Sequence, residues 1–131
     1  MTESILIVDD NVDNLALTRF LLEAQGFAVR VAENAAQALH VLQRYRPNLI
    51  LMDIQLPEMD GLELTRRLRQ NPALDRVPIV ALSAYAMKVD LENAQAAGCQ
   101  GYITKPIDTR TFVATVQNYL AAGVTPAGVP G

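Results

Sequence analysis

Short runs of apolar residues without polar alternation occupy residues 5–8, 49–52 and 79–82. Such runs are typical of β-strands that are covered on both faces. In residues 27–31, by contrast, apolar side chains alternate with polar or small ones, which indicates a half-exposed strand at the edge of a sheet. A further strand is expected at residues 101–104, just before a Lys-Pro pair. The chain therefore contains five candidate strands.

Helical segments separate these strands. Side chains that can cap a helix N-terminus precede four of the segments: Asn11, Asn34, Asp60 and Asp108. The predicted ends of these helices are Gly26, Arg46, Leu68 and about Ala121. An alanine-rich helix is expected over about residues 85–97. Strands that alternate with helices imply a parallel sheet with right-handed crossovers, and hence a three-layer α/β domain.

Composition and charge limit the classes of function. The 131 residues fit one domain, which we expect to span residues 1–121, and the Gly- and Pro-rich residues 122–131 are expected to form a flexible tail or linker. A net charge of −3 argues against nucleic acid or an anionic membrane as the main partner. No secretory signal and no apolar stretch of ~20 residues is present, so a cytoplasmic protein is expected.

Two smaller features of the composition have ordinary structural explanations. Arg66, Arg67 and Arg69 form the one basic cluster, and on a helix they are expected to make a solvated face. Cys99 is the single cysteine, so it cannot form an internal disulfide, and we expect it to be a small buried hydrophobe.

The residues at the strand ends carry the candidate chemistry. Asp9 and Asp10 follow the first strand, and the later strands end at Asp53, Ser83 and Lys105. Because the carboxyl ends of parallel strands meet at one edge, these side chains should converge there. Three close carboxylates repel one another, so either one is protonated or a hard divalent cation neutralises them. Oxygen ligands favour Mg²⁺, Mn²⁺ or Ca²⁺ over zinc, and the small number of protein oxygens favours a partly hydrated Mg²⁺.

A carboxylate, a divalent cation, a lysine and a hydroxyl together suit phosphoryl transfer. They supply a nucleophile, charge neutralisation and donors for the phosphoryl oxygens. Three carboxylates and one lysine sum to −2, which one Mg²⁺ would neutralise. The alternative is that the acids are merely helix caps and loop residues, but that explanation leaves the serine and lysine at neighbouring strand ends unexplained.

Four motifs resemble those of the receiver domain of two-component response regulators. They are IVDDN at residues 7–11, LILMDIQLPEMDG at 49–61, ALSA at 81–84 and YITKP at 102–106. The likeness covers about residues 4–121 and is strongest to single-domain and hybrid-kinase phosphorelay receivers. It implies a flavodoxin-like fold with strand order 2-1-3-4-5. It also implies a signalling switch, not an enzyme, that assists its own Mg²⁺-dependent phosphorylation and dephosphorylation.

Matched residue by residue, the resemblance implies a phosphoacceptor site. Asp53 would accept a phosphoryl group from a partner's phosphohistidine. Asp9, Asp10, Asp53 and the backbone carbonyl of Gln55 would hold Mg²⁺, and Lys105 would pair with a phosphoryl oxygen.

The resemblance further implies a conformational switch. Ser83 would rotate to hydrogen-bond a phosphoryl oxygen, and Tyr102 would turn inward when Ser83 moves. The Lys105–Pro106 peptide is expected to be cis.

Partners follow from the same resemblance. A histidine kinase or histidine phosphotransferase is expected to dock at the rim of the site, and a downstream protein target would read the switch. The expected rim contacts are Asn11, Asn14, Leu15 and Pro106. The chain is expected to be a monomer or a weak dimer.

Three other functions are compatible with a similar fold or a similar site. A flavoprotein of similar fold needs a Ser-, Thr- or Gly-rich loop after the first strand, and the loop here is DDNVDN. An aspartyl phosphatase usually has a second acid two residues after its nucleophile, where this chain has Gln55. The remaining alternative is a receiver that serves as a constitutive interaction or dimerisation scaffold.

Overall fold

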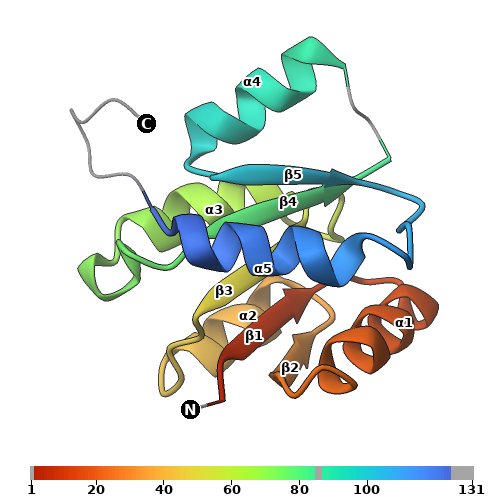
Figure 1. Ribbon diagram of the computed structural model, residues 1–131. Coiled ribbons are helices and arrows are strands. Elements are labelled where there is room, and N and C mark those ends of the chain that lie inside the picture. Colours follow the sequence, from red (N-terminus) through yellow and green to blue (C-terminus); the bar gives the residue numbers. More distant parts are fainter. Residues whose placement is uncertain (1, 85–86, 125–131) are drawn as a thin grey trace.

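A five-stranded parallel sheet forms the centre of the molecule in the computed structural model, which describes residues 2–84 and 87–124 (Figure 1). Its strands are β1 (Ser4–Val8), β2 (Ala28–Ala32), β3 (Leu49–Asp53), β4 (Ile79–Ser83) and β5 (Gly101–Thr104). Their order is β2-β1-β3-β4-β5, and every pair of neighbours is parallel. The predicted strand order and flavodoxin-like fold are confirmed.

Helices cover both faces of this sheet (Figure 1). They are α1 (Val12–Glu23), α2 (Ala35–Leu42), α3 (Gly61–Arg69), α4 (Lys88–Ala97) and α5 (Phe112–Ala122), with a short 3₁₀ helix, η1 (Pro72–Leu74). Within the described residues, none of these helices combines the length and the apolar character that crossing a bilayer would require.

The core has two halves because successive side chains of a strand point to opposite faces. On one face, Ile5 and Ile7 of β1 pack with residues of α1 and α5. On the other face, Leu6 and Val8 pack with residues of α2, α3 and α4. β3 and β4 are buried along their whole length, as their unbroken apolar runs predicted. β2 is half-exposed, which confirms it as an edge strand.

Most of the predicted helix starts are confirmed by their caps. The side chains of Asn11, Asn34 and Asp60 each accept a hydrogen bond from the backbone N–H three residues later. Gly98 ends α4 in the left-handed conformation, with φ of 113°. The predicted start of α4 near residue 85 falls outside the described residues, and the helix begins at Lys88.

Two predicted helix boundaries are wrong. Asp108 does not cap the last helix, because its Oδ1 accepts from the Arg110 N–H in a tight turn and α5 begins only at Phe112. The second helix stops at Leu42, before the predicted Arg46. Backbone bonds from Gln43 and the next residue reach back only three positions, which tightens the helix end into a 3₁₀ turn.

Candidate functional site

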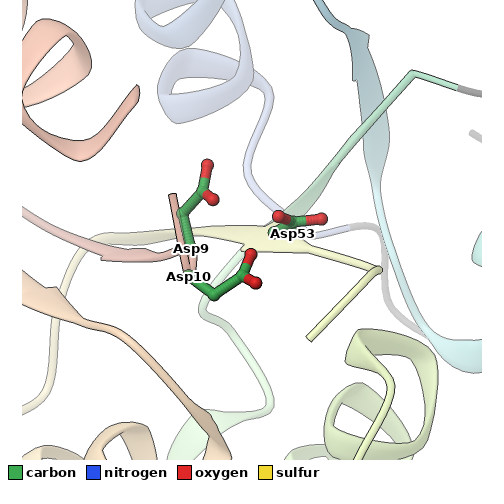
Figure 2. A group of neighbouring side chains, drawn as sticks. All are labelled: Asp9, Asp10 and Asp53. Atoms are coloured by element: carbon green, nitrogen blue, oxygen red, sulfur yellow. The ribbon is translucent and has the colours of Figure 1, made fainter. Parts of the chain in front are cut away.

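The carboxyl ends of β1 and β3 bring the three predicted aspartates together (Figure 2). Carboxylate oxygens of Asp9, Asp10 and Asp53 all lie within 4.8 Å of one another. Asp9 and Asp53 are buried, whereas Asp10 is exposed. The predicted convergence of these carboxylates at one sheet edge is therefore present in the structure.

Asp9 is held in place by the start of α1. Its Oδ1 accepts from the Asn11 N–H at 2.9 Å, and its Oδ2 accepts from the side-chain amide of Asn14. Lys105 Nζ lies 3.2 Å from the same Oδ2. Asn14, which the sequence assigned to partner docking, thus also orients a site carboxylate. Sequence reasoning missed this role, although a position in the first turn of α1 places the amide back over the end of β1.

Asp53 is almost completely enclosed, with 2% of its surface exposed. Its Oδ1 accepts from the Gln55 N–H at 2.8 Å, and its Oδ2 accepts from Lys105 Nζ at 2.9 Å. Burial raises the pKa of Asp53 to about 6, and the charge of Asp9 adds to this increase, while the bonds from Gln55 and Lys105 oppose it. The hydrogen bonds from Gln55 and Lys105 therefore offset only part of the free-energy cost of burying the ionised Asp53 carboxylate.

Lys105 is the cation of the site and lies between two of its carboxylates. Burial lowers the pKa of this ammonium, but the hydrogen bond and charge of Asp53, together with Asp9, outweigh burial, so the pKa lies above its ordinary value. Its backbone is positioned by β4, because the Lys105 N–H donates to the Ser83 carbonyl at 2.8 Å. The Lys105–Pro106 peptide is cis, as predicted.

Ser83 and Tyr102 lie on the two strands beyond Asp53. Ser83 is fully buried at the end of β4 and pairs in register with Thr104 of β5. Tyr102 is partly buried against the core on the α4 face. Its hydroxyl is buried and has no hydrogen-bond partner among the described residues. A buried hydroxyl without a hydrogen-bond partner carries a free-energy cost.

Gly61 lets the first residue of α3 lie close to the backbone at the end of β3. A Cβ at this position would lie 2.2 Å from the carbonyl oxygen of Asp53 and 2.6 Å from the Cα of Ile54. Glycine is therefore required for the first residue of α3 to reach the end of β3, where its N–H donates to the Ile54 carbonyl at 3.0 Å.

The predicted docking residues are only partly at the surface. Asn11 and Pro106 are exposed beside the site. Leu15, in contrast, is 6% exposed because it faces the core in line with Leu22, so little of its surface is available for the contact that the sequence predicted. Among the apolar side chains of α1 that do reach solvent, Phe20 is the most open, with 69% of its surface exposed.

Residues 5–117 match the family model of the response regulator receiver domain. The chain belongs to this family. The receiver is 44% identical over 120 residues to the polar-differentiation response regulator DivK of Brucella anthropi, a match that covers 92% of this chain and 98% of DivK.

Solved receiver structures are also similar. The receiver domain of a sensor histidine kinase from Pseudomonas aeruginosa, described with a magnesium ion coordinated in its active site cleft, superposes with a TM-score of 0.83 at 34% identity. That match covers 92% of this chain and 99% of the other. The chemotaxis response regulator CheY4 of Vibrio cholerae gives a TM-score of 0.86 at 25% identity, over 90% of this chain and 98% of CheY4.

Family and fold agree on the class of function. The chain is a receiver domain of phosphoacceptor signalling in two-component systems, and its family is one of signalling switches. Its acidic cluster is a group of oxygen ligands that could hold a divalent cation.

Proposed function

We propose that Asp53 is the phosphoacceptor and that it receives its phosphoryl group from a phosphohistidine of a kinase or phosphotransferase. The observation that supports this role most directly is the pairing of a buried carboxylate at the end of β3 with the Lys105 ammonium at 2.9 Å. This pairing places a nucleophilic oxygen beside a cation that can hold an oxygen of the incoming group.

The residues present fit a Mg²⁺ ion. Asp9, Asp10, Asp53 and the backbone carbonyl of Gln55 would hold it, and all of these ligands are oxygens, which Mg²⁺ prefers. With Lys105 included, the four charged side chains sum to −2, so these residues leave a net negative charge that a divalent cation would neutralise. When bound, Mg²⁺ supplies charge neutralisation for an anionic donor.

The chain's own residues then perform the transfer. An Asp53 oxygen forms a bond to phosphorus while the bond from phosphorus to the donor's imidazole nitrogen breaks, and that nitrogen keeps the electron pair. A pKa of about 6 leaves most of the Asp53 carboxylate ionised at neutral pH, as a nucleophile must be. Lys105 exchanges its bond to Asp53 for one to the phosphoryl group. The same groups assist the later hydrolysis of the acyl phosphate.

The switch is proposed to run through β4 and β5. Once Asp53 is phosphorylated, the Ser83 side chain rotates so that its hydroxyl donates a hydrogen bond to a phosphoryl oxygen. The Tyr102 side chain then fills the space that Ser83 leaves. The unpartnered hydroxyl of Tyr102 supports this step, because no hydrogen bond to that hydroxyl has to be broken when the ring moves. The altered surface around α4 would then be read by a downstream protein.

Partner docking is proposed at the rim of the site. Asn11 and Pro106 are exposed there, and Asn14 is partly exposed beside them. The apolar contribution that the sequence assigned to Leu15 falls instead to exposed α1 side chains such as Val12 and Phe20. These side chains lie on the helix that begins next to Asp10, so a donor that reaches Asp53 would also cover them.

Intact mass spectrometry with a small phosphodonor tests the acceptor. We expect one added phosphoryl group on the wild type in Mg²⁺, none after chelation, and none on Asp53→Asn. Asp13→Asn is the matched control, because it removes an exposed carboxylate of α1 outside the cluster. An adduct that persists on Asp53→Asn would refute the assignment. A wild type that binds Mg²⁺ and beryllofluoride without forming an adduct would indicate rapid hydrolysis, whereas failure to bind beryllofluoride would favour a constitutive scaffold.

A further inference from the structure

The two halves of α4 are held very differently. From Lys88 through residue 93 no side chain is buried, and the apolar Val89 and Leu91 are exposed. The buried side chains of the helix are Ala94 and Ala97, both in its C-terminal half. In Figure 1 the helix lies beyond β5, at the edge of the sheet. Its N-terminal half therefore has little apolar contact to oppose displacement.

Among the described residues, the polar contacts at the N-terminal end of α4 lie within the helix and its N-cap. The Met87 N–H donates to Asp90 Oδ2 at 3.1 Å, three residues further on. Lys88 and Glu92 form an exposed ion pair at 3.9 Å. Exposed pairs of this kind contribute little to stability, and neither contact ties the helix to the rest of the domain.

At the C-terminal end, one guanidinium joins four parts of the fold. Arg69 Nε donates to the Gly98 carbonyl at 3.0 Å, and Nη1 donates to the Leu74 carbonyl at 2.8 Å. Nη2 donates to Gln100 Oε1, which also accepts from the Ile79 N–H at 2.9 Å. The end of α4 is thus connected through Arg69 to α3, to η1 and to the start of β4.

This environment separates Arg69 from the other arginines of its cluster, which the sequence predicted to be uniformly solvated. That prediction is wrong for Arg69, which is partly buried, and burial lowers the pKa of its guanidinium. Arg66 and Arg67 are exposed, and within the described part of the chain their ion-pair partner is Glu63, at 3.3 and 3.8 Å. A Cβ on Gly98 would lie 2.7 Å from Arg69 Cγ, so the close fit also requires glycine at the helix end.

We propose that Arg69 is a positioning residue for the switch: it anchors the C-terminal end of α4, so that the response to the phosphoacceptor site is confined to the N-terminal half of the helix. The N-terminal half is the part that follows β4 in the chain, and β4 ends at Ser83. A change at Ser83 therefore reaches first the half of the helix that has the fewest contacts. The Arg69 anchor then acts as the pivot. This inference rests on the proposed function of Asp53.

Amide hydrogen exchange without any phosphodonor tests the anchor separately from the switch. The Cys99 N–H donates to the Ala94 carbonyl at 3.0 Å, and the Gln100 N–H donates to the Ile79 carbonyl at 2.8 Å. We expect exchange of both amides to be at least about tenfold faster in Arg69→Gln than in the wild type, because hydrogen bonds to a charged donor are lost. Arg66→Gln is the matched control on the same helix, and it should leave both rates unchanged. Equal rates in the wild type and Arg69→Gln would overturn the proposal.

Beryllofluoride with Mg²⁺ then tests the pivot by amide chemical shifts. We expect the wild-type response within α4 to be confined to residues 88–93 and the Arg69→Gln response to extend through Gly98. A helix that only became less stable would exchange faster without moving this boundary. A wild-type response that is equally large at Ala97 would overturn the pivot. If no residue of α4 responds in the wild type, the proposed switch itself fails, while the exchange rates still show whether Arg69 anchors the helix.

A second variant keeps the test decisive if Arg69→Gln does not fold. Arg69→Lys retains the positive charge and the aliphatic stem but loses the forked set of donors. We expect it to fold and to speed exchange at Cys99 and Gln100 in the same direction as Arg69→Gln. Wild-type exchange rates in Arg69→Lys would show that positive charge alone suffices, and would overturn the assignment to the guanidinium contacts.

Discussion

Replacing Asp53 with asparagine should stabilise the metal-free protein at neutral pH, although it removes the proposed acceptor. The carboxylate is 2% exposed, and burial raises its pKa from 3.8 to about 6. One pKa unit corresponds to about 1.4 kcal/mol, so ionised Asp53 destabilises the folded state by roughly 3 kcal/mol. The single amide oxygen of asparagine can keep the bond from the Gln55 N–H, and Lys105 retains its ion pair with Asp9, while the buried charge of Asp53 is removed. We therefore expect Asp53→Asn to be more stable by about 1–3 kcal/mol.

The sign of the pH dependence follows from the same shift. Because the folded pKa lies above the unfolded one, the folded state binds more protons between about pH 4 and pH 6, and stability falls as pH rises through this window. From about pH 4.5 to pH 7.5 this single group should lower the free energy of unfolding of the wild type by roughly 2 kcal/mol. The Asp53→Asn variant lacks this contribution.

Urea denaturation with a chelator present, at about pH 4.5 and about pH 7.5, measures the free energy of unfolding of the wild type and of Asp53→Asn. Asp13→Asn is the control, because it removes an exposed acid. Added Mg²⁺ should then reverse the order, because an ion that binds the folded wild type more tightly than the variant stabilises the wild type more. The reasoning would be refuted if Asp53→Asn were no more stable than the wild type at neutral pH, or if its advantage were equal at both pH values.

Three further predictions concern the neighbours of the site. Gly61→Ala should destabilise the fold by about 2 kcal/mol or more and slow phosphorylation by a small donor, because its Cβ would meet the Asp53 carbonyl oxygen at 2.2 Å; wild-type stability in urea and wild-type phosphorylation rates would contradict this. Lys105→Gln should move the pH-dependent loss of stability in the metal-free protein above about pH 6, because Lys105 lowers the pKa of Asp53, and an unmoved midpoint would count against that coupling. Leu15→Ala should cost about 2–4 kcal/mol of unfolding free energy and Leu17→Ala less than about 1, since their exposures are 6% and 37%, and similar losses in the two variants would disprove the assignment of Leu15 to the core.

Much of the fold could be predicted from the sequence because its signals are local. The strands at residues 5–8, 49–52 and 79–82 appear as unbroken apolar runs, and the structure places them in the doubly covered middle of the sheet. Asn11, Asn34 and Asp60 cap helices through bonds that span three residues. A local signal can also predict the wrong element. Asp108 has the side chain of a helix cap, but it accepts a hydrogen bond within a turn that precedes the helix.

The candidate site was predictable for a topological reason. Once strands alternate with helices in a parallel sheet, their carboxyl ends must meet at one edge, so Asp9, Asp53 and Lys105 converge although they are far apart in sequence. The sequence by itself therefore determined which reactive side chains lie together and at which edge of the sheet they do so.

Only the tertiary structure decided how deeply each side chain is buried and which charged or polar groups it contacts. Leu15 and Leu17 are two positions apart and chemically identical, yet packing buries one and leaves the other partly open. Arg66 and Arg69 share a helix, but only Arg69 meets carbonyls from residues 74 and 98. Burial and the proximity of charges depend on segments distant in sequence, and these two quantities set the pKa of Asp53 and the anchoring of α4.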